Sequence, residues 1–267
     1  MSPSATGGHI GPAVRTVLDG AMTSTELQVD HRDDYSVYQT STFAALLAGI
    51  YDGDVTVEQL LRHGDFGLGT FNHLDGEMVV LDGVCHHLRS DGTVTPADGA
   101  AHTPFAAVTR FHDRIAFDVT GPMTLDALEA RIDAASGGEN ASVAVRVDGT
   151  FTAVRTRTVS EQHQPYVPFV EVTAHQTESS LTATTGTVVG FRTPKFEAGI
   201  SVVGYHLHYV DDARARGGHV LDLVLSEGRV SISPITQLHL ILPESADFLS
   251  ADLHLDRLEQ EQRQTEG

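Results

Sequence analysis

Hydrophobic and polar positions change their spacing along the chain and divide it into three regions. Residues 1–34 are small, polar and acidic with little periodicity, which predicts a flexible N-terminal arm. Residues 35–140 mix helical patterns with short strand patterns. In residues 141–267 strand patterns dominate and end in a polar, partly helical tail. We therefore expect an arm followed by two domains.

The second region contains three helical patterns. STFAALLAGIYDG predicts a helix capped by Ser41 or Thr42, with Gly53 beyond its end. TVEQLLRHG predicts a second short helix that stops at Gly64. In TLDALEARIDAAS the leucine and isoleucine residues fall on one face at helical spacing, which predicts an amphipathic helix.

Strand patterns are separated by turn signals in both halves of the chain. Asp-Gly pairs that begin at Asp75, Asp82 and Asp91 lie between short apolar or alternating runs, and they favour hairpin turns. From residue 141 the stretches ASVAVRVDGTFTAVRTRTVS, TTGTVVGFRTP, GISVVGYHLHYV and GGHVLDLVLSEGRVSISP follow one another. Their spacing predicts a barrel or a strongly curved sheet in this half.

Charge and composition exclude several classes of partner. The 267 residues include 36 acidic and 17 basic ones, for a net charge of -19, which argues against nucleic acid and anionic membranes as partners. Lys195 is the only lysine, a bias that a high-salt cytosol or high-GC coding would each produce. No apolar run reaches the roughly 20 residues of a membrane span, and the first residues do not resemble a secretory signal. Because Cys85 is the sole cysteine, no intramolecular disulfide can form, and we expect a cytoplasmic protein.

The stretch GYHLHYVDDARARGGHV contains a candidate metal site. His206 and His208 share one strand face about 6–7 Å apart, and an antiparallel next strand would bring His219 beside them. Three neutral imidazoles with an open coordination position are typical of catalytic zinc or a similar transition metal. The alternative is coincidence, since the chain has 15 histidines.

Two charged residues lie on strands that are otherwise largely apolar. By strand alternation, Arg157 falls on the same predicted face as Phe151 and Arg155. Its permanent charge requires an anion, either an acidic side chain or an anionic substrate. Glu77 begins a strand whose two faces are both apolar, so its carboxyl group either pairs or stays protonated.

The candidate residues lie in stretches of sequence that resemble a known family. From about residue 35 to the C-terminus the chain resembles the α-acetolactate decarboxylase family, in the stretches VYQTSTFAALLAGIYDGD, GDFGLGTFNHLDGE, LRSDGTVTP, RTRTV, PYVPFVE, GTVVGFRTP, GISVVGYHLHYVDD, GGHVLDLVL and TEG. GYHLH followed by GGHV is the most specific of these. LHLDRLEQEQRQ, near the C-terminus, departs from the family in composition.

The resemblance implies a set of site residues. Three histidines of the family hold zinc, and its active site adds an arginine, two glutamates and a threonine. In this chain they correspond to His206, His208, His219, Arg157, Glu77, Glu266 and Thr70. Glu259 and Glu261 are the alternatives for the glutamate of the C-terminal tail.

The resemblance also implies a fold and a reaction. The fold is α+β and rich in strands: a mixed β-sheet domain with helices at 35–140, which joins the partner's sheet in a homodimer, and a zinc-bearing β-barrel-like domain at 141–267. The reaction is decarboxylation of 2-acetolactate to acetoin and CO2, a step of acetoin biosynthesis. Zinc, or another divalent transition metal, would stabilise an enediolate as a Lewis acid, and Glu77 or Glu266 would protonate one face of it.

Two other functions use the same residues. Another zinc enzyme, such as a lactonase or other hydrolase, could employ a hydroxide on the three histidines. A non-catalytic metal-binding β-barrel would bind the ion without turnover.

Overall fold

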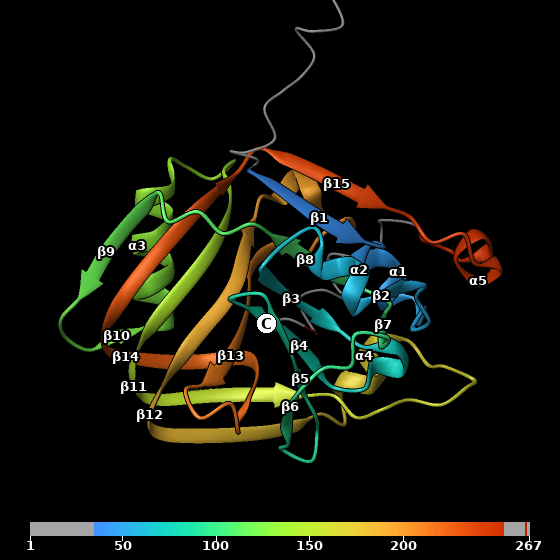
Figure 1. The fold of residues 1–267 in the computed structure, drawn as a ribbon, viewed down its shortest axis with the longest axis horizontal. Helices are drawn as coiled ribbons and strands as arrows, with labels where there is room; N and C mark the ends of the chain where they lie inside the picture. Colours follow the sequence, from blue (N-terminus) through green and yellow to red (C-terminus); the bar gives the residue numbers. More distant parts are fainter. Residues whose placement is uncertain (1–34, 254–264, 266–267) are drawn as a thin grey trace, which may run out of the picture. The chain divides into compact units, whose positions relative to one another are not determined.

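The computed structural model describes residues 35–253 and Thr265. Internal contacts group Tyr35–Gly267 into one compact unit, separate from Met1–Asp34. The predicted N-terminal arm lies outside the described residues. Across residues 35–253 no helix has the length and apolar character that a membrane crossing requires. Figure 1 labels the strands that form the two main sheets of this unit.

The first sheet has seven strands and is mixed, as the resemblance implied. In spatial order its strands are β15 (Gln237–Ile241), β1 (Ser36–Thr40), β8 (Ala106–Thr109), β3 (Phe66–Thr70), β4 (Glu77–Leu81), β5 (Val84–Leu88) and β6 (Val94–Pro96). β1 and β15 run parallel, and the other neighbours are antiparallel. β15 follows the second sheet in the chain, so the described polypeptide returns to the first sheet near its end. A separate two-stranded sheet consists of β2 (Val55–Thr56) and β7 (His102–Thr103).

The two short helices beside the first sheet follow local capping signals. α1 (Phe43–Leu47) begins after Thr42, whose hydroxyl accepts a hydrogen bond from the first turn of the helix. α2 (Val57–Leu61) begins with a capping box at Thr56. α1 is shorter than predicted, because Gly49 adopts a φ of +92° directly after it and turns the chain.

The Asp-Gly pairs lie where they were predicted, at turns between antiparallel strands. They connect β3 to β4, β4 to β5 and β5 to β6. Their glycines all have positive φ: Gly76, Gly83 and Gly92. Glycine adopts this conformation without a steric penalty, which explains the pattern.

The second sheet contains the long strands and closes on itself. Its strands are β9 (Ile115–Val119), β10 (Met123–Thr124), β11 (Ser142–Thr158), β12 (Thr177–Thr193), β13 (Gly204–Asp211) and β14 (Gly217–Ile235). β11 pairs with both β12 and β14, β12 pairs with β13, and β13 pairs with β14. The four strands β11 to β14 therefore form a closed ring of pairings, which agrees with the predicted barrel-like half.

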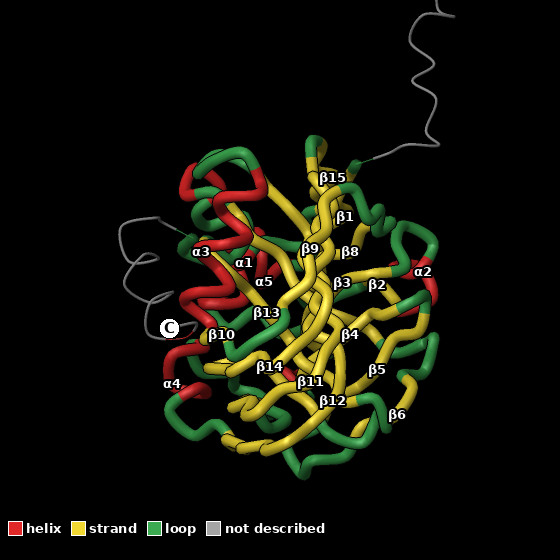
Figure 2. The backbone as a smooth tube through the Cα atoms, turned by 90° about the vertical axis from the view of Figure 1, so that its left-hand side faces the viewer, coloured by secondary structure: helices red, strands yellow, loops and turns green. Residues whose placement is uncertain are grey.

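A hydrophobic cluster fills the ring, and a helix covers one side of it. α3 (Leu125–Ser136) follows Thr124 and lies along the long strands (Figure 2), against which it buries Leu128 and Ile132. Both residues belong to the face that the amphipathic pattern predicted. The remaining helices are α4 (Phe169–Thr173), α5 (Ala246–Ser250) and the 3-10 turns η2 (Asn72–Leu74) and η3 (Lys195–Glu197).

The two sheets pack face to face. Leu68 and Val79 of the first sheet share one buried cluster with Val189 and Val210 of the second. The opposite face of β4 packs in a separate cluster with α2, so both faces of this strand are buried, as its sequence predicted. β9 and β10 pair with β14 although they precede residue 141. A division into two domains at that position stays a prediction.

Candidate metal centre and active site

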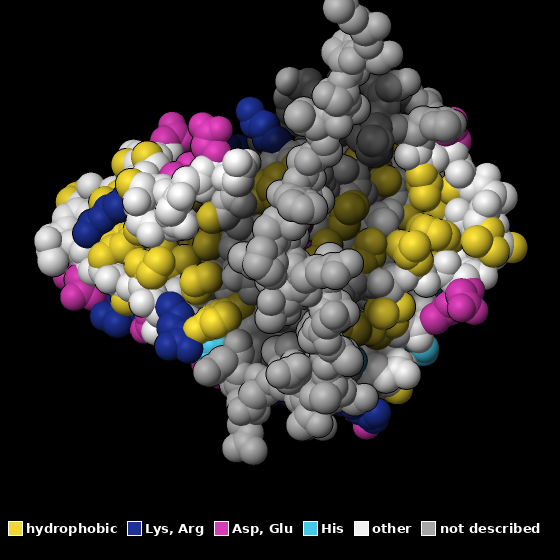
Figure 3. Space-filling model, turned by 90° about the horizontal axis from the view of Figure 1, so that it is seen from above, with side chains coloured by type: hydrophobic (Ala, Val, Ile, Leu, Met, Phe, Trp, Pro, Cys, Tyr) yellow, Lys and Arg dark blue, Asp and Glu magenta, His cyan; other side chains and the backbone are white. Residues whose placement is uncertain are grey.

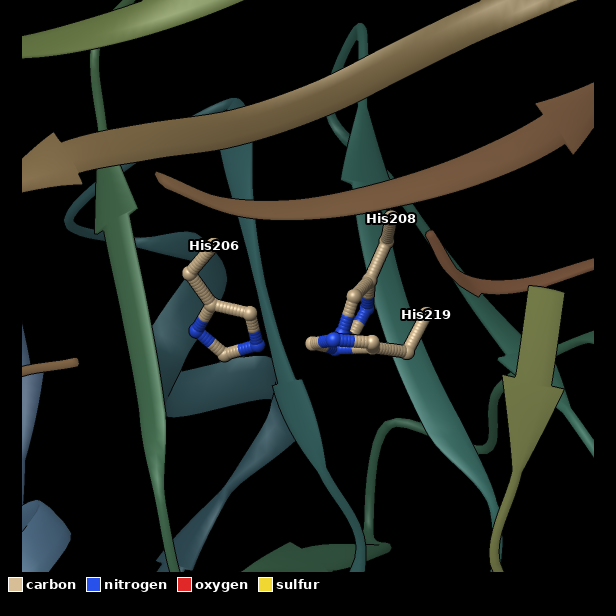
Figure 4. Close-up of side chains that lie close together, drawn as sticks. All are labelled: His206, His208 and His219. Atoms are coloured by element: carbon tan, nitrogen blue, oxygen red, sulfur yellow. The ribbon is translucent and has the colours of Figure 1, made fainter. Parts of the chain in front are cut away.

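Three histidines converge on the face of the second sheet that meets the first (Figure 4). His206 and His208 come from β13, and His219 on β14 pairs directly with His208. The ring centroids lie 5.0, 5.2 and 5.4 Å apart, and one nitrogen of each ring lies within 4.8 Å of the others. The antiparallel neighbour thus places the third histidine beside the first two, as the strand pattern predicted.

The hydrogen bonding of His208 fits a metal ligand. Its Nδ1 lies 2.8 Å from the carbonyl oxygen of Met78. A carbonyl can only accept, so Nδ1 carries the hydrogen and Nε2 keeps its lone pair. Nε2 is buried without a hydrogen-bond partner among the described residues, and it lies 3.6 Å from Oε2 of Glu77. A buried lone pair beside a carboxyl oxygen suits a cation, and a carbonyl behind a ligating imidazole is the usual arrangement at metals.

All three imidazoles are held in the neutral form that a metal requires. Their exposed fractions are 9% for His206, 0% for His208 and 3% for His219. This burial lowers the pKa of each ring, and the positive charge of Arg157 lowers it further. The pKa of His208 falls to about 3, although its hydrogen bond to Met78 acts in the opposite direction. The donor set therefore fits Zn²⁺ or a similar divalent ion.

The lowered histidine pKa values predict acid sensitivity of the metal-free protein. An unfolded histidine takes up a proton below a pKa of about 6.5, whereas these folded ones stay neutral to lower pH. The contribution of these rings to the free energy of unfolding is then fully present above about pH 6.5. Below that pH it falls by up to about 1.4 kcal/mol per pH unit for each histidine. Urea unfolding of chelator-treated protein at pH 7.5, 6 and 5 measures this slope. A flat profile would show that the rings are protonated without unfolding.

Glu77 and Thr70 reach the site from the first sheet. They are directly opposite each other at the ends of β3 and β4, and both are buried. The hydroxyl of Thr70 donates to the carbonyl oxygen of Gly76 at 2.7 Å, so it holds the turn that leads into Glu77. Glu77 belongs to the same face of β4 as Val79, and this face points at the second sheet. Thr70 therefore helps to position Glu77.

Arg157 reaches the site from β11, where it pairs with His219 on β14. It is only 2% exposed, and its Nη2 donates to the carbonyl oxygen of Thr265 at 2.6 Å. Its guanidinium also lies 6.0 Å from the centre of the Phe169 ring, a residue for which the sequence suggested no role. Phe169 follows β11 only after a loop, so the alternation of that strand could not reveal the contact.

The predicted alternation along β11 is wrong in part. Irregular pairing with β14 at Phe151 and again after Arg155 shifts the strand. Phe151 consequently faces the interior of the second sheet, away from the histidines. Arg155 is exposed and forms an ordinary ion pair with Glu178 at 3.3 Å. Only Arg157 is turned into the buried site.

One small pocket brings most of the predicted residues together. It has a volume of about 20 Å³, and its polar lining consists of Thr70, Glu77, Arg157, His206 and His219. His208 lies next to this group, with its Nε2 3.6 Å from Oε2 of Glu77 and its ring beside those of His206 and His219. Glu266 and the alternatives Glu259 and Glu261 lie outside the described residues.

Other histidines play different roles. His87 stacks on Phe71 with ring centroids 3.8 Å apart, on the side of the first sheet that α2 covers. His73 contacts the hydroxyl of Tyr166 at 2.5 Å. Neither belongs to the group of possible metal ligands found among the described residues.

Comparison with known proteins identifies relatives over nearly the whole described chain. Residues 37–255 match the family model for alpha-acetolactate decarboxylase. The alpha-acetolactate decarboxylase of Bacillus subtilis is 42% identical over 86% of this chain and 91% of its own length. The enzyme of that name from Methylococcus capsulatus is 44% identical over 83% of this chain and 85% of its own.

Solved structures agree with the sequence comparison. The crystal structure of the Bacillus subtilis alpha-acetolactate decarboxylase matches with a TM-score of 0.85, covering 87% of this chain and 99% of that one. A Staphylococcus aureus protein described as similar to alpha-acetolactate decarboxylase matches with a TM-score of 0.83 at 30% identity, covering 86% and 99%. Fold, sequence and match length agree: the chain belongs to the alpha-acetolactate decarboxylase family.

Proposed function

We propose that this protein decarboxylates 2-acetolactate to acetoin and CO2 at the pocket between its two sheets. The observation that carries the proposal is the convergence of three neutral histidines, one buried arginine and one buried carboxyl group. The relatives named above carry the same activity in their names. Release of CO2 and acetoin from racemic acetolactate by the purified, metal-loaded protein tests it directly.

The reaction creates negative charge that the site must accommodate. Breaking the bond between the carboxylate carbon and C2 leaves an electron pair, which moves into a double bond between C2 and C3 and places charge on the ketone oxygen. A divalent ion on His206, His208 and His219, Zn²⁺ in our proposal, would supply Lewis acidity to the oxygens that gain this charge. No organic cofactor is required, because the ketone itself accepts the electrons.

Arg157 supplies a fixed positive charge beside the three histidines. It lines the same pocket as His206 and His219, so it is close enough to act on a charged substrate there. In our proposal its guanidinium binds the departing carboxylate or the developing oxyanion through charge-assisted hydrogen bonds. The carbonyl oxygen of Thr265 and the ring of Phe169 orient it.

Glu77 is the proposed proton donor. Its carboxyl group is buried and lies 3.6 Å from Nε2 of His208, in the pocket that Arg157 also lines. A proton on this group could pass to C2 from one side only, which would make the product chiral. Glu266 is the alternative donor, or it positions the proton of Glu77.

Replacing Glu77 by glutamine tests this role. We expect the variant to keep its metal and to lose about 10²–10⁴-fold in kcat, because an amide cannot deliver the proton. Steady-state acetoin formation and elemental analysis measure the two quantities. Glu58→Gln, at an exposed glutamate paired with Arg62, is the control and should match the wild type. Normal turnover of Glu77→Gln would exclude Glu77 as the donor.

Two other functions remain as outcomes of the same assay. A lactonase or other hydrolase with the same three histidines would open lactones and leave acetolactate unchanged. A non-catalytic metal-binding protein would take up the ion and turn over neither substrate. Glu77 and Arg157 support the decarboxylase, since metal binding alone gives neither residue a reason to be buried beside the histidines.

We further propose a cytoplasmic homodimer that acts on a small molecule, without nucleic acid or membrane partners. The net charge of -19 and the single cysteine support the location and the absence of polyanionic partners. Size-exclusion chromatography with light scattering tests the dimer.

A further inference from the structure

A second and much larger cavity lies next to the metal pocket. It has a volume of about 670 Å³ and is called the chamber below. Its inner end is lined by Leu68, Ala107 and Phe191, which come from both sheets. It reaches the surface at Phe196 and Leu238, which are 70% and 38% exposed. Figure 3 shows a face of the protein on which hydrophobic side chains gather.

Two of the larger polar side chains that line the chamber are already bonded to protein atoms. The guanidinium of Arg192 donates to Asp133 at 3.1 Å. The amide of Gln39 accepts from Ser201 at 2.7 Å and donates to two backbone carbonyls. The free surface of the chamber is therefore mostly apolar and suits a hydrocarbon group better than a charged one.

The metal pocket is too small for the whole substrate. A volume of about 20 Å³ holds roughly one water molecule, whereas acetolactate has about nine non-hydrogen atoms. Two residues, Phe105 and His206, line both this pocket and the chamber. The carboxylate and oxygens of a substrate belong at Arg157 and the histidines, so its alkyl groups point along the wall that these two residues form.

Phe105 is the wall residue that carries no chemistry. It lies in the bend between β7 and β8, where its carbonyl oxygen accepts from the backbone of Thr70 at 3.0 Å. β3 approaches closely here because Gly69 has no Cβ, which would collide with this same carbonyl oxygen. The ring is 3% exposed and packs on Phe43 at a centroid distance of 6.0 Å. The backbone is thus fixed, and the size of the side chain sets the opening.

We propose that Phe105 determines which 2-alkyl groups the enzyme accepts, by closing the metal pocket against the chamber. The ligands that this wall would hinder are 2-hydroxy-3-keto acids whose 2-alkyl substituents are longer than the methyl group of acetolactate. The inference rests on the proposed function, since it assigns the specificity of the same site. An apolar opening of this kind discriminates by methylene groups, each of which changes kcat/KM several-fold.

The test measures a ratio of substrates rather than activity alone. Acetolactate and the analogue with a 2-propyl in place of the 2-methyl group are compared by kcat/KM. Phe105→Leu, which shortens the wall, should raise the propyl-to-methyl ratio by at least about ten-fold. Ala107→Met, added to Phe105→Leu, fills the chamber from β8 and should return the ratio toward the wild-type value. Phe66→Leu is the matched control, because Phe66, on the neighbouring strand β3, is similarly buried but lines neither cavity, and its ratio should stay unchanged.

A binding measurement separates the wall from the chemistry. The 2,3-dihydroxy acids, in which the ketone is reduced, cannot lose CO2 by this route, and calorimetry should show the same change of preference in their Kd. If the wild type does not release CO2 from acetolactate, the proposed function is wrong. If it does, and folded Phe105→Leu keeps the wild-type ratio, only the role of Phe105 is wrong. Should Phe105→Leu fail to fold, Phe105→Met, which also removes the ring, is compared by the same two measurements.

Discussion

Replacing His206 by alanine is expected to remove the bound metal and to lower kcat/KM by at least about 10³-fold while the fold is kept. Two imidazoles hold a divalent ion far more weakly than three, and the Lewis acidity is worth several kcal/mol. The fold should survive because His206 lies at the edge of both cavities and not within the hydrophobic clusters. Elemental analysis, CO2 release and circular dichroism measure the three effects.

The control is another buried histidine outside the group. His86 on β5 is 7% exposed, and its Nδ1 has no hydrogen-bond partner among the described residues. His86→Ala should retain the metal and the activity. Full metal content and normal turnover in His206→Ala would show that the three histidines are not the metal site.

Replacing Arg157 by lysine should lower kcat/KM by about 10²–10³-fold with unchanged metal content. Lysine keeps the charge but lacks the planar fork that binds a carboxylate at two points, and removal of one such donor typically has this effect. A loss of this size without loss of metal assigns Arg157 to the substrate rather than to the ion. Steady-state kinetics with acetolactate and metal analysis of the same preparation measure both.

Arg155 offers a matched control on the same strand. It lies two residues before Arg157, is exposed and pairs with Glu178. Arg155→Lys should behave as the wild type, since exposed ion pairs contribute little. Equal losses in the two variants would point to a general effect on β11, and an unaffected Arg157→Lys would remove the arginine from the mechanism.

Local signals in the sequence predicted elements whose structure depends on nearby residues. Thr42 and Thr56 start helices because a hydroxyl can bond the first turn, and the Asp-Gly pairs turn hairpins because glycine tolerates positive φ. The predicted end of α1 is too late because the prediction used Gly53 as the stop signal, whereas Gly49, the earlier glycine, adopts the positive φ that ends the helix. The face of Phe151 was missed because a bulge depends on the partner strand β14.

The sequence by itself determined the three-histidine hairpin, because strand alternation and a short turn fix which side chains share a face. It also identified Glu77 and Arg157 as unusual, because a charge on a largely apolar strand needs a partner. Only the tertiary structure decided that both lie beside the histidines, since β4 meets β13 through the packing of two sheets and β11 reaches His219 by pairing with β14. It alone revealed the chamber and the place of Phe105, because a cavity between sheets is formed by residues far apart in the chain.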